Sequence, residues 1–151
     1  SLAAQNMDPN FEKRIRTSFA RQTIMKTIGA RILSLSPGEV VIELTYREDL
    51  TQQHGFVHAG VITAIVDSAC GYAALSLMPP DSGVLTIEYK ANFLSPAKGS
   101  TFIATGRVLK PGRTLTVCSG DVVAVEDGKE KRVATMLATM MRLEENQDLA
   151  D

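Results

Sequence analysis

The chain has 151 residues, of which 44% are hydrophobic and 22% are charged, and its formal net charge is -1. This size and composition predict one globular domain with a substantial core. Lysine and arginine residues are scattered and form no basic stripe, which argues against binding to nucleic acids or general attraction to membrane surfaces.

The cysteines and the N-terminal residues predict a cytoplasmic protein. Cys70 and Cys118 are the only two cysteines, so the sequence contains neither a disulfide framework nor a CxxC pair that would suggest export. Charged residues between Asp8 and Arg16 stand where a signal peptide would need an apolar core. Residues 61–78 are long enough to span a membrane, but Asp67 within them argues against stable membrane association.

The first predicted elements are a helix over residues 8–28 and a β-hairpin. Asp8 is a suitable cap for the helix, Pro9 suits its first position, and Gly29 ends it. The apolar residues of this helix fall on roughly one side: Phe11, Ile15, Phe19, Ile24 and Ile28. Residues 30–35 and 40–46 then flank a Ser-Pro-Gly-Glu turn, which predicts the two arms of the hairpin.

A second long helix is predicted over residues 59–77, where the chain is rich in alanine, and Pro79-Pro80 stops it. This helix is apolar on nearly every side, so other parts of the protein must enclose it.

Four strands follow, over residues 85–93, 100–109, 113–125 and 131–143. In the first, alternation places one set of apolar residues on a single face: Leu85, Ile87, Tyr89, Ala91 and Phe93. In the third, the apolar positions change phase at residues 119–121, which predicts a bulge or a strong bend. We expect the ends of the chain, residues 1–7 and 144–151, to be frayed.

This order of elements predicts an α+β fold in which an antiparallel sheet wraps around the long central helix. Consecutive strands at hairpin spacing favour antiparallel pairing, and only the sheet is available to enclose the helix. The strand faces that point away from the helix also carry apolar residues. We therefore expect them to pack on another copy of the chain.

Asp67 is the first candidate for a functional residue. It is the only residue with a formal charge between Asp49 and Asp81, and its neighbours in the predicted helix are apolar. Burying a carboxylate is costly without a partner, and the segment contains no lysine or arginine to provide one. A purely structural hydrogen-bonding role is the alternative.

Both histidines lie just before this helix. The helix begins near His58, so the unpaired N–H groups of its first turn and the positive end of its dipole are expected beside the histidines, where they can bind an oxyanion. His54 and His58 are four residues apart, as in some zinc sites. However, Gly55 interrupts a helix there and the glutamate of the zinc-protease motif is missing, so we expect no metal.

The spacing of these residues resembles the signature of hotdog-fold acyl-CoA thioesterases of the phenylacetate-degradation (PaaI-like) type. That signature is an Asn or Gln, a His-Gly-Gly six residues later, and an Asp nine residues after the His. Here the matching residues are Gln52, His58-Ala59-Gly60 and Asp67. The strand and turn at residues 87–99 are similar as well. Ala59 in place of glycine and Gln52 in place of the common asparagine are the two departures.

The resemblance implies a single hotdog domain over residues 1–151 that hydrolyses acyl-CoA without a cofactor. It implies that Asp67 acts as nucleophile or general base and that the Ala59 N–H is the oxyanion donor. Gln52 would orient water or substrate, and His58 would hold the loop. For substrate binding we expect Gly60, Thr86, Val57, Phe56, Lys110 and Arg113, the last two at the phosphates of CoA. The family also implies a homodimer that assembles further into a homotetramer.

Two other classes of function remain open. A dehydratase or isomerase on the same fold would pair an aspartate with a histidine in a hydratase motif, which this sequence does not contain. A non-catalytic acyl-CoA-binding module would not need Asp67.

Overall fold

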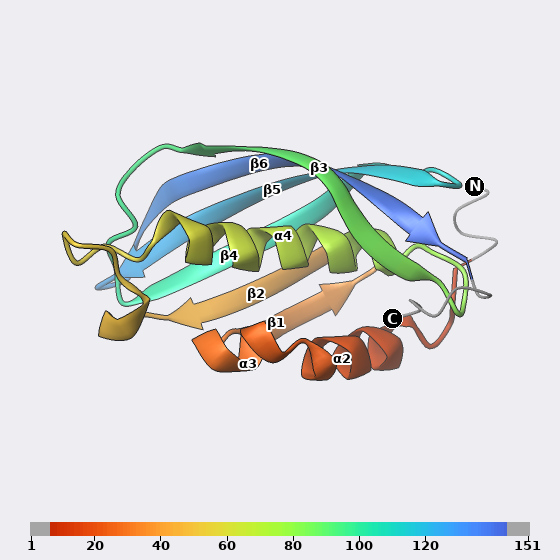
Figure 1. Ribbon diagram of the computed structural model, residues 1–151, viewed down its shortest axis with the longest axis horizontal. Helices are drawn as coiled ribbons and strands as arrows, with labels where there is room; N and C mark the ends of the chain where they lie inside the picture. The colour runs from red at the N-terminus through yellow and green to blue at the C-terminus, as the bar shows by residue number, and fades with distance from the viewer. Residues whose placement is uncertain (1–6, 145–151) are drawn as a thin grey trace.

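A computed structural model describes residues 7–144 and contains one sheet wrapped around one long helix (Figure 1). The sheet has six strands in the order β1-β2-β4-β5-β6-β3, and every pair of neighbours is antiparallel. The strands are β1 (Arg31–Ser36), β2 (Glu39–Thr45), β3 (Gly83–Phe93), β4 (Thr101–Lys110), β5 (Leu115–Glu126) and β6 (Lys129–Leu143). The central helix is α4 (Ala59–Leu75). This is the hotdog architecture, and the predicted fold class is confirmed.

Helix α4 lies directly on the middle of the sheet because two glycines allow the close approach. Gly106 of β4 and Gly120 of β5 are register partners. A Cβ added at Gly106 would lie 2.4 Å from the backbone carbon of Ala69, and one at Gly120 would lie 2.6 Å from a methyl of Val66. Any side chain at either position would push the helix away from the sheet.

The prediction of a bulge at residues 119–121 is wrong. Alternate residues of β5 from Thr116 to Ala124 are buried without interruption, and Gly120 is one of them. The apparent change of phase arose because a glycine occupies an inward position. The irregularity lies instead on β6, where Val133 is an extra residue between the partners of Val122 and Val123.

The predicted N-terminal helix is two helices, α2 (Phe11–Arg21) and α3 (Thr23–Ile28), so the single helix over residues 8–28 is corrected. Gln22 separates them with non-helical torsions, φ -80° and ψ 89°. The break shifts the phase of the second part, so Met25 is 1% exposed while Ile24, expected inside, is 52% exposed. Gly29 ends α3, as predicted, and the structure shows that it does so in the left-handed conformation.

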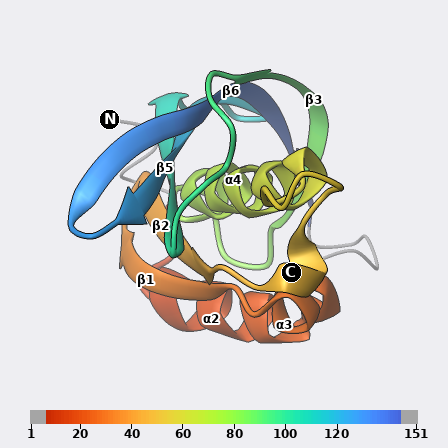
Figure 2. The same cartoon turned by 90° about the vertical axis from the view of Figure 1, so that its left-hand side faces the viewer.

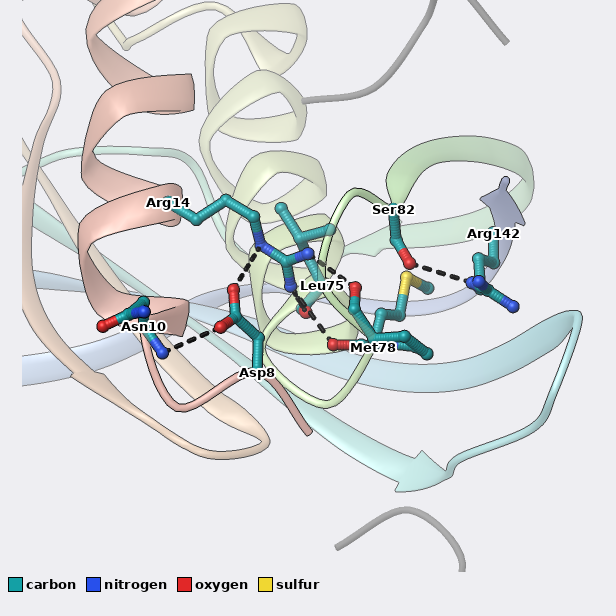
Figure 3. A network of polar contacts seen from close by, with 8 residues as sticks. Asp8, Asn10, Arg14, Leu75, Met78, Ser82 and Arg142 are labelled. Atoms are coloured by element: carbon teal, nitrogen blue, oxygen red, sulfur yellow. Dashed lines mark hydrogen bonds and ion pairs between the residues drawn. The ribbon is translucent and has the colours of Figure 1, made fainter. Parts of the chain in front are cut away.

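Helices α2 and α3 form an N-terminal arm that runs beside β1 and against α4 (Figure 2). Figure 3 shows how Arg14 fastens the arm to the C-terminal end of α4. Its guanidinium donates hydrogen bonds to the carbonyl oxygens of Pro79 (2.6 Å), Leu75 (2.9 Å) and Met78 (3.2 Å), and Asp8 lies 3.6 Å from its Nε. Carbonyl groups at the end of a helix lack the partners that the helix gives to the others, and a cation also suits this end of the helix dipole.

Strand β3 is an edge of the sheet, and its predicted single apolar face is interrupted. The register shifts between Thr86 and Glu88, so Ile87 bulges out of the ladder. Thr86 pairs with Met140 and Tyr89 pairs with Ala138, both of which are buried under α4. Thr86 therefore faces the helix. Leu85 and Tyr89 lie on opposite faces, so the prediction that they share one face is wrong.

The ends predicted to be frayed lie outside the described residues, apart from Met7 and Glu144. Among residues 7–144, no helix is both long enough and apolar enough to cross a membrane.

Candidate active site

A short loop before α4 is held in shape by Gln52. The Gln52 side-chain oxygen accepts hydrogen bonds from the N–H groups of His54 and Phe56, and the Gln52 N–H donates to the Phe56 oxygen at 2.9 Å. Gly55 has a φ of 83° at the tip of this loop. Because the amide oxygen of Gln52 is occupied, what it can offer a ligand is its NH₂ group, which only donates.

His58 caps the N-terminus of α4. Its Nδ1 accepts a hydrogen bond of 2.8 Å from the Gly60 N–H, so Nδ1 is unprotonated and the proton of the neutral ring is on Nε2. A Cβ at Gly60 would lie only 3.0 Å from this Nδ1. Gly60 therefore leaves room for the cap, and its own N–H is not free for a substrate.

The N–H of Ala59 is the free donor at the start of α4. The N–H groups of Val61 and Ile62 donate to the His58 oxygen at 3.0 and 3.2 Å, and that of Gly60 is bound to the His58 ring. Within the described part of the chain, the Ala59 N–H makes no hydrogen bond, and Ala59 is exposed. Its φ is not positive, so alanine fits here without strain. A free N–H at the positive end of a helix dipole is suited to an anion.

Asp67 lies further along α4 and is half-buried. Thr86 donates a hydrogen bond of 2.7 Å to its Oδ1. Burial raises the pKa of the Asp67 carboxyl, and the Thr86 hydrogen bond opposes this rise. Among residues 7–144, no lysine or arginine pairs with it. The group is thus a partly desolvated carboxylate with one oxygen held by a hydroxyl.

Ala59 and Asp67 of one chain cannot act on the same carbonyl group. They are eight residues apart on a continuous helix, which separates their backbones by about 12 Å along its axis. A donor and a nucleophile must each come within about 3 Å of the reacting group.

The other predicted binding residues lie at two ends of α4. Phe56 is half-buried and Val57 is 3% exposed, and the Val57 N–H donates to the Ala97 oxygen beside the helix start. Lys110 is the last residue of β4 and Arg113 follows the strand, and both side chains are exposed. That end lies near the C-terminus of α4, as shown by the hydrogen bonds that Gly38 makes to Val108 and Ser76. The chain therefore does not bring these cations to its own Ala59.

One polar cluster beside Asp67 was not predicted. Ser68 donates to Gln22 Oε1 at 2.9 Å, and Gln22 Nε2 donates to the Tyr72 hydroxyl at 3.0 Å. The sequence carries one signal for it, the spacing of Ser68 and Tyr72 on one side of the helix.

An antiparallel sheet wrapped around a long helix places the protein among the hotdog-fold proteins. Residues 54–131, just over half of the sequence, match the thioesterase superfamily, and the chain belongs to this superfamily. It is a thioesterase.

Three known proteins illustrate the relationship. Human acyl-coenzyme A thioesterase 13 is 32% identical over 99 residues, which cover 65% of this chain and 70% of that protein. A thioesterase family protein from Silicibacter pomeroyi has a structure with a TM-score of 0.88 and 52% identity, covering 89% of this chain and 98% of that one. The E. coli PaaI protein, from the phenylacetic acid degradation operon, shares the fold with a TM-score of 0.80 at 21% identity, covering 89% and 94%.

Proposed function

We propose that the protein hydrolyses acyl-CoA thioesters to a free acid and CoA. The observation that carries this proposal is the unbonded, exposed N–H of Ala59 at the start of a helix that also bears a half-buried aspartate. Thioester hydrolysis needs a donor for the developing oxyanion and a group that attacks or activates water. The name of human acyl-coenzyme A thioesterase 13 supports CoA as the thiol of the substrate.

In the proposed reaction, the thioester oxygen accepts a hydrogen bond from the Ala59 N–H. Asp67 then either attacks the carbonyl carbon or takes a proton from the attacking water. Negative charge builds on the oxygen, where the N–H and the helix dipole stabilise it, and a preorganised donor of this kind contributes about 10²–10³-fold in kcat. The C–S bond breaks and the CoA thiolate leaves. If water attacked, the acyl group is then the carboxylic acid; if Asp67 attacked, it is a mixed anhydride, which water hydrolyses to the acid and free Asp67.

Four residues support Ala59 and Asp67. Thr86 helps to keep Asp67 ionised through its hydrogen bond. The free NH₂ of Gln52 donates to the water or to the substrate. His58 holds the loop by capping the helix, and Gly60 makes room for that cap.

We propose that each site is shared between two chains. The axial distance of about 12 Å between Ala59 and Asp67 supports a site in which the carboxylate of one chain meets the oxyanion donor of another. Strand β3, which carries Thr86, is a sheet edge with exposed apolar residues: Leu85 (44%), Ile87 (49%), Tyr89 (47%) and Phe93 (50%). An unpaired edge with such residues favours pairing with a second copy. We expect a homodimer that pairs into a homotetramer, and light scattering at micromolar concentration tests this.

The pocket residues are proposed on the same basis. Phe56 and Val57, next to the helix start, would contact the apolar part of the substrate. Lys110 and Arg113 would meet the CoA phosphates at the Ala59 site of a neighbouring chain, since they are remote from their own. Cys70 and Cys118 are both free and buried, which supports the predicted cytoplasmic location.

A panel of short, medium, long and aromatic acyl-CoA esters tests the activity, with release of free thiol as the readout. We expect turnover of at least one ester, unchanged by EDTA. If no ester of the panel is hydrolysed but CoA esters still bind, the result would favour a non-catalytic binding module.

A further inference from the structure

Helix α4 is covered unequally along its length. All residues from Ala69 to Ser76 are buried, whereas the part from His58 to Ser68 contains mostly exposed or half-buried residues. The arm formed by α2 and α3 covers the buried half, where Arg14 binds the C-terminal carbonyls of α4. The boundary between the two halves falls at the turn that carries Asp67.

Gln22 is the residue of the arm that contacts this boundary. It lies at the break between α2 and α3, so its side chain projects from a non-helical position. Its amide oxygen accepts the Ser68 hydroxyl at 2.9 Å, and its amide nitrogen donates to the Tyr72 hydroxyl at 3.0 Å. The Tyr72 hydroxyl also lies 3.1 Å from the Ser18 hydroxyl. One side chain thus ties two successive turns of α4 to the arm.

We infer that Gln22 is a positioning residue for Asp67, acting through Ser68. Consecutive helical side chains point about 100° apart, so Asp67 reaches Thr86 on β3 while Ser68 reaches Gln22 on the arm. The turn that carries the carboxylate is held from two sides by one hydrogen bond each. This inference rests on the proposed reaction at Asp67.

The arm lies outside residues 54–131, the part of the chain that matches the thioesterase superfamily, because α2 and α3 lie before residue 29. The matching part supplies the oxyanion donor, Asp67 and Thr86. The arm adds a contact that fixes where the carboxylate lies, and a reacting group displaced by about 1 Å can lose up to about 10²-fold in rate.

Two substitutions on opposite sides of the contact test the inference. Gln22→Met keeps the length of the side chain and removes both hydrogen bonds, and Ser68→Ala removes the partner. We expect each to lower kcat by about tenfold or more while KM changes by less than about twofold. Because both act on one contact, the double variant should be no slower than the slower single variant.

Ile28→Val is the matched control, because it trims a buried side chain at the other end of the same arm. We expect it to leave kcat near that of the unmodified protein at a comparable loss of Tm. If Ile28→Val lowers kcat as much as Gln22→Met does, Gln22 serves only to stabilise the arm. Additive effects of Gln22→Met and Ser68→Ala would also overturn the inference, because they would show separate actions.

A second readout separates this inference from the proposed reaction. Amide hydrogen exchange across residues 64–72 reports how firmly the turn is held, whether or not any acyl-CoA is hydrolysed. We expect faster exchange there in Gln22→Met than in Ile28→Val. If the protein is inactive on the whole panel but the two variants differ in exchange, the proposed reaction is refuted while the contact between Gln22 and Ser68 is supported. Equal exchange in the two variants would refute the positioning role.

Discussion

Thr86 Oγ1 donates a hydrogen bond of 2.7 Å to Asp67 Oδ1, which joins the edge strand β3 to the central helix α4. The bulge at Ile87 determines which residues of β3 share the face of Thr86, toward the helix. A hydroxyl has a single proton to donate, so the 3.3 Å contact between Thr86 and Met140 Sδ is secondary to the bond with the carboxylate. The second oxygen of Asp67 makes no hydrogen bond within residues 7–144, and we propose that it takes part in the reaction.

Replacing Thr86 by valine should move the pH dependence of catalysis. The hydrogen bond lowers the pKa of Asp67 against the effect of burial, so its removal should raise that pKa. If ionised Asp67 is required, the acid limb of the kcat/KM profile should shift to higher pH in Thr86→Val. Thr86→Ser keeps the hydroxyl and should retain the original limb. An identical acid limb in all three proteins would show that Thr86 does not tune this group.

Asp67→Asn should lower kcat by about 10³-fold or more, because the amide can neither attack nor accept a proton. The amide oxygen can still accept the Thr86 hydroxyl, so we expect binding of CoA esters to be retained. Single-turnover assays and isothermal titration measure the two effects separately. Near-normal turnover in Asp67→Asn would remove this residue from the mechanism.

The same substitution should stabilise the protein at neutral pH. Burial raises the pKa of Asp67, so between its unfolded and folded pKa values the folded state binds more protons than the unfolded state. Stability is therefore lost as pH rises through that interval, and an amide, which does not ionise, avoids this loss. We expect Asp67→Asn to raise Tm at pH 7, with the gain fading below the ordinary Asp pKa of about 3.9. A lower Tm at pH 7 would contradict the desolvation of Asp67.

The fold could be predicted because its periodic segments are long. The strands and α4 matched their expected ranges closely, since alternation and continuous apolar character depend on burial alone. The break at Gln22 and the bulge at Ile87 could not be predicted in the same way. Gln22 contacts α4, and the bulge at Ile87 is a shift in the pairing of β3 with β6; both contacts occur only once the elements have packed together.

In the candidate site, too, local features could be predicted from the sequence and long-range contacts could not. Gln52, His58, Ala59 and Asp67 were selected by spacing, and the structure adds which of their groups are already bonded. The Ala59 N–H is free because the first N–H groups of a helix have no acceptor within it and the His58 cap binds the N–H of Gly60 instead, and both are local features. By contrast, the contact of Gln22 with Ser68 spans 46 residues of sequence, and the spacing of Ser68 and Tyr72 does not indicate that Gln22 is their partner.

Two glycines should respond to alanine in opposite ways. Gly106→Ala places a Cβ 2.4 Å from the backbone of α4, which must shift, so we expect a loss of at least about 1–3 kcal/mol in the free energy of unfolding. A Cβ at Gly71, within α4, would have no atom within 4 Å. Gly71→Ala should therefore stabilise the helix by about 0.5–1 kcal/mol. Denaturant unfolding measures both, and equal effects would contradict the close contact at Gly106.

Ala59→Pro should remove the oxyanion donor without disturbing the helix. The Ala59 N–H makes no hydrogen bond within residues 7–144, proline suits the first position of a helix, and His58 already has a ψ of 137°, which a following proline favours. We expect kcat to fall by about 10²–10³-fold at an unchanged Tm. Ala59→Gly keeps the N–H and should remain active. Full activity of Ala59→Pro would exclude this group as the donor.

The shared site can be tested by mixing two inactive chains. An Asp67→Ala chain keeps its donor loop but lacks the carboxylate, and an Ala59→Pro chain keeps the carboxylate but lacks the donor. Each homodimer should therefore be inactive. In their heterodimer, one site collects both changes while the other has an intact Ala59 and an intact Asp67. Subunit exchange should therefore restore about half of the activity of an unmodified dimer per heterodimer, as two equivalent sites require.

Mixing Asp67→Ala with Asp67→Asn is the control, because every site in that heterodimer lacks the carboxylate and no activity should return. Native mass spectrometry confirms that exchange has occurred in both mixtures. If heterodimers of the Asp67→Ala and Ala59→Pro chains form but stay inactive, the two groups do not meet across this interface. The distance of about 12 Å along α4 would then have to be bridged within one chain, which a continuous helix does not allow, so the roles of Ala59 and Asp67 would have to be reassigned.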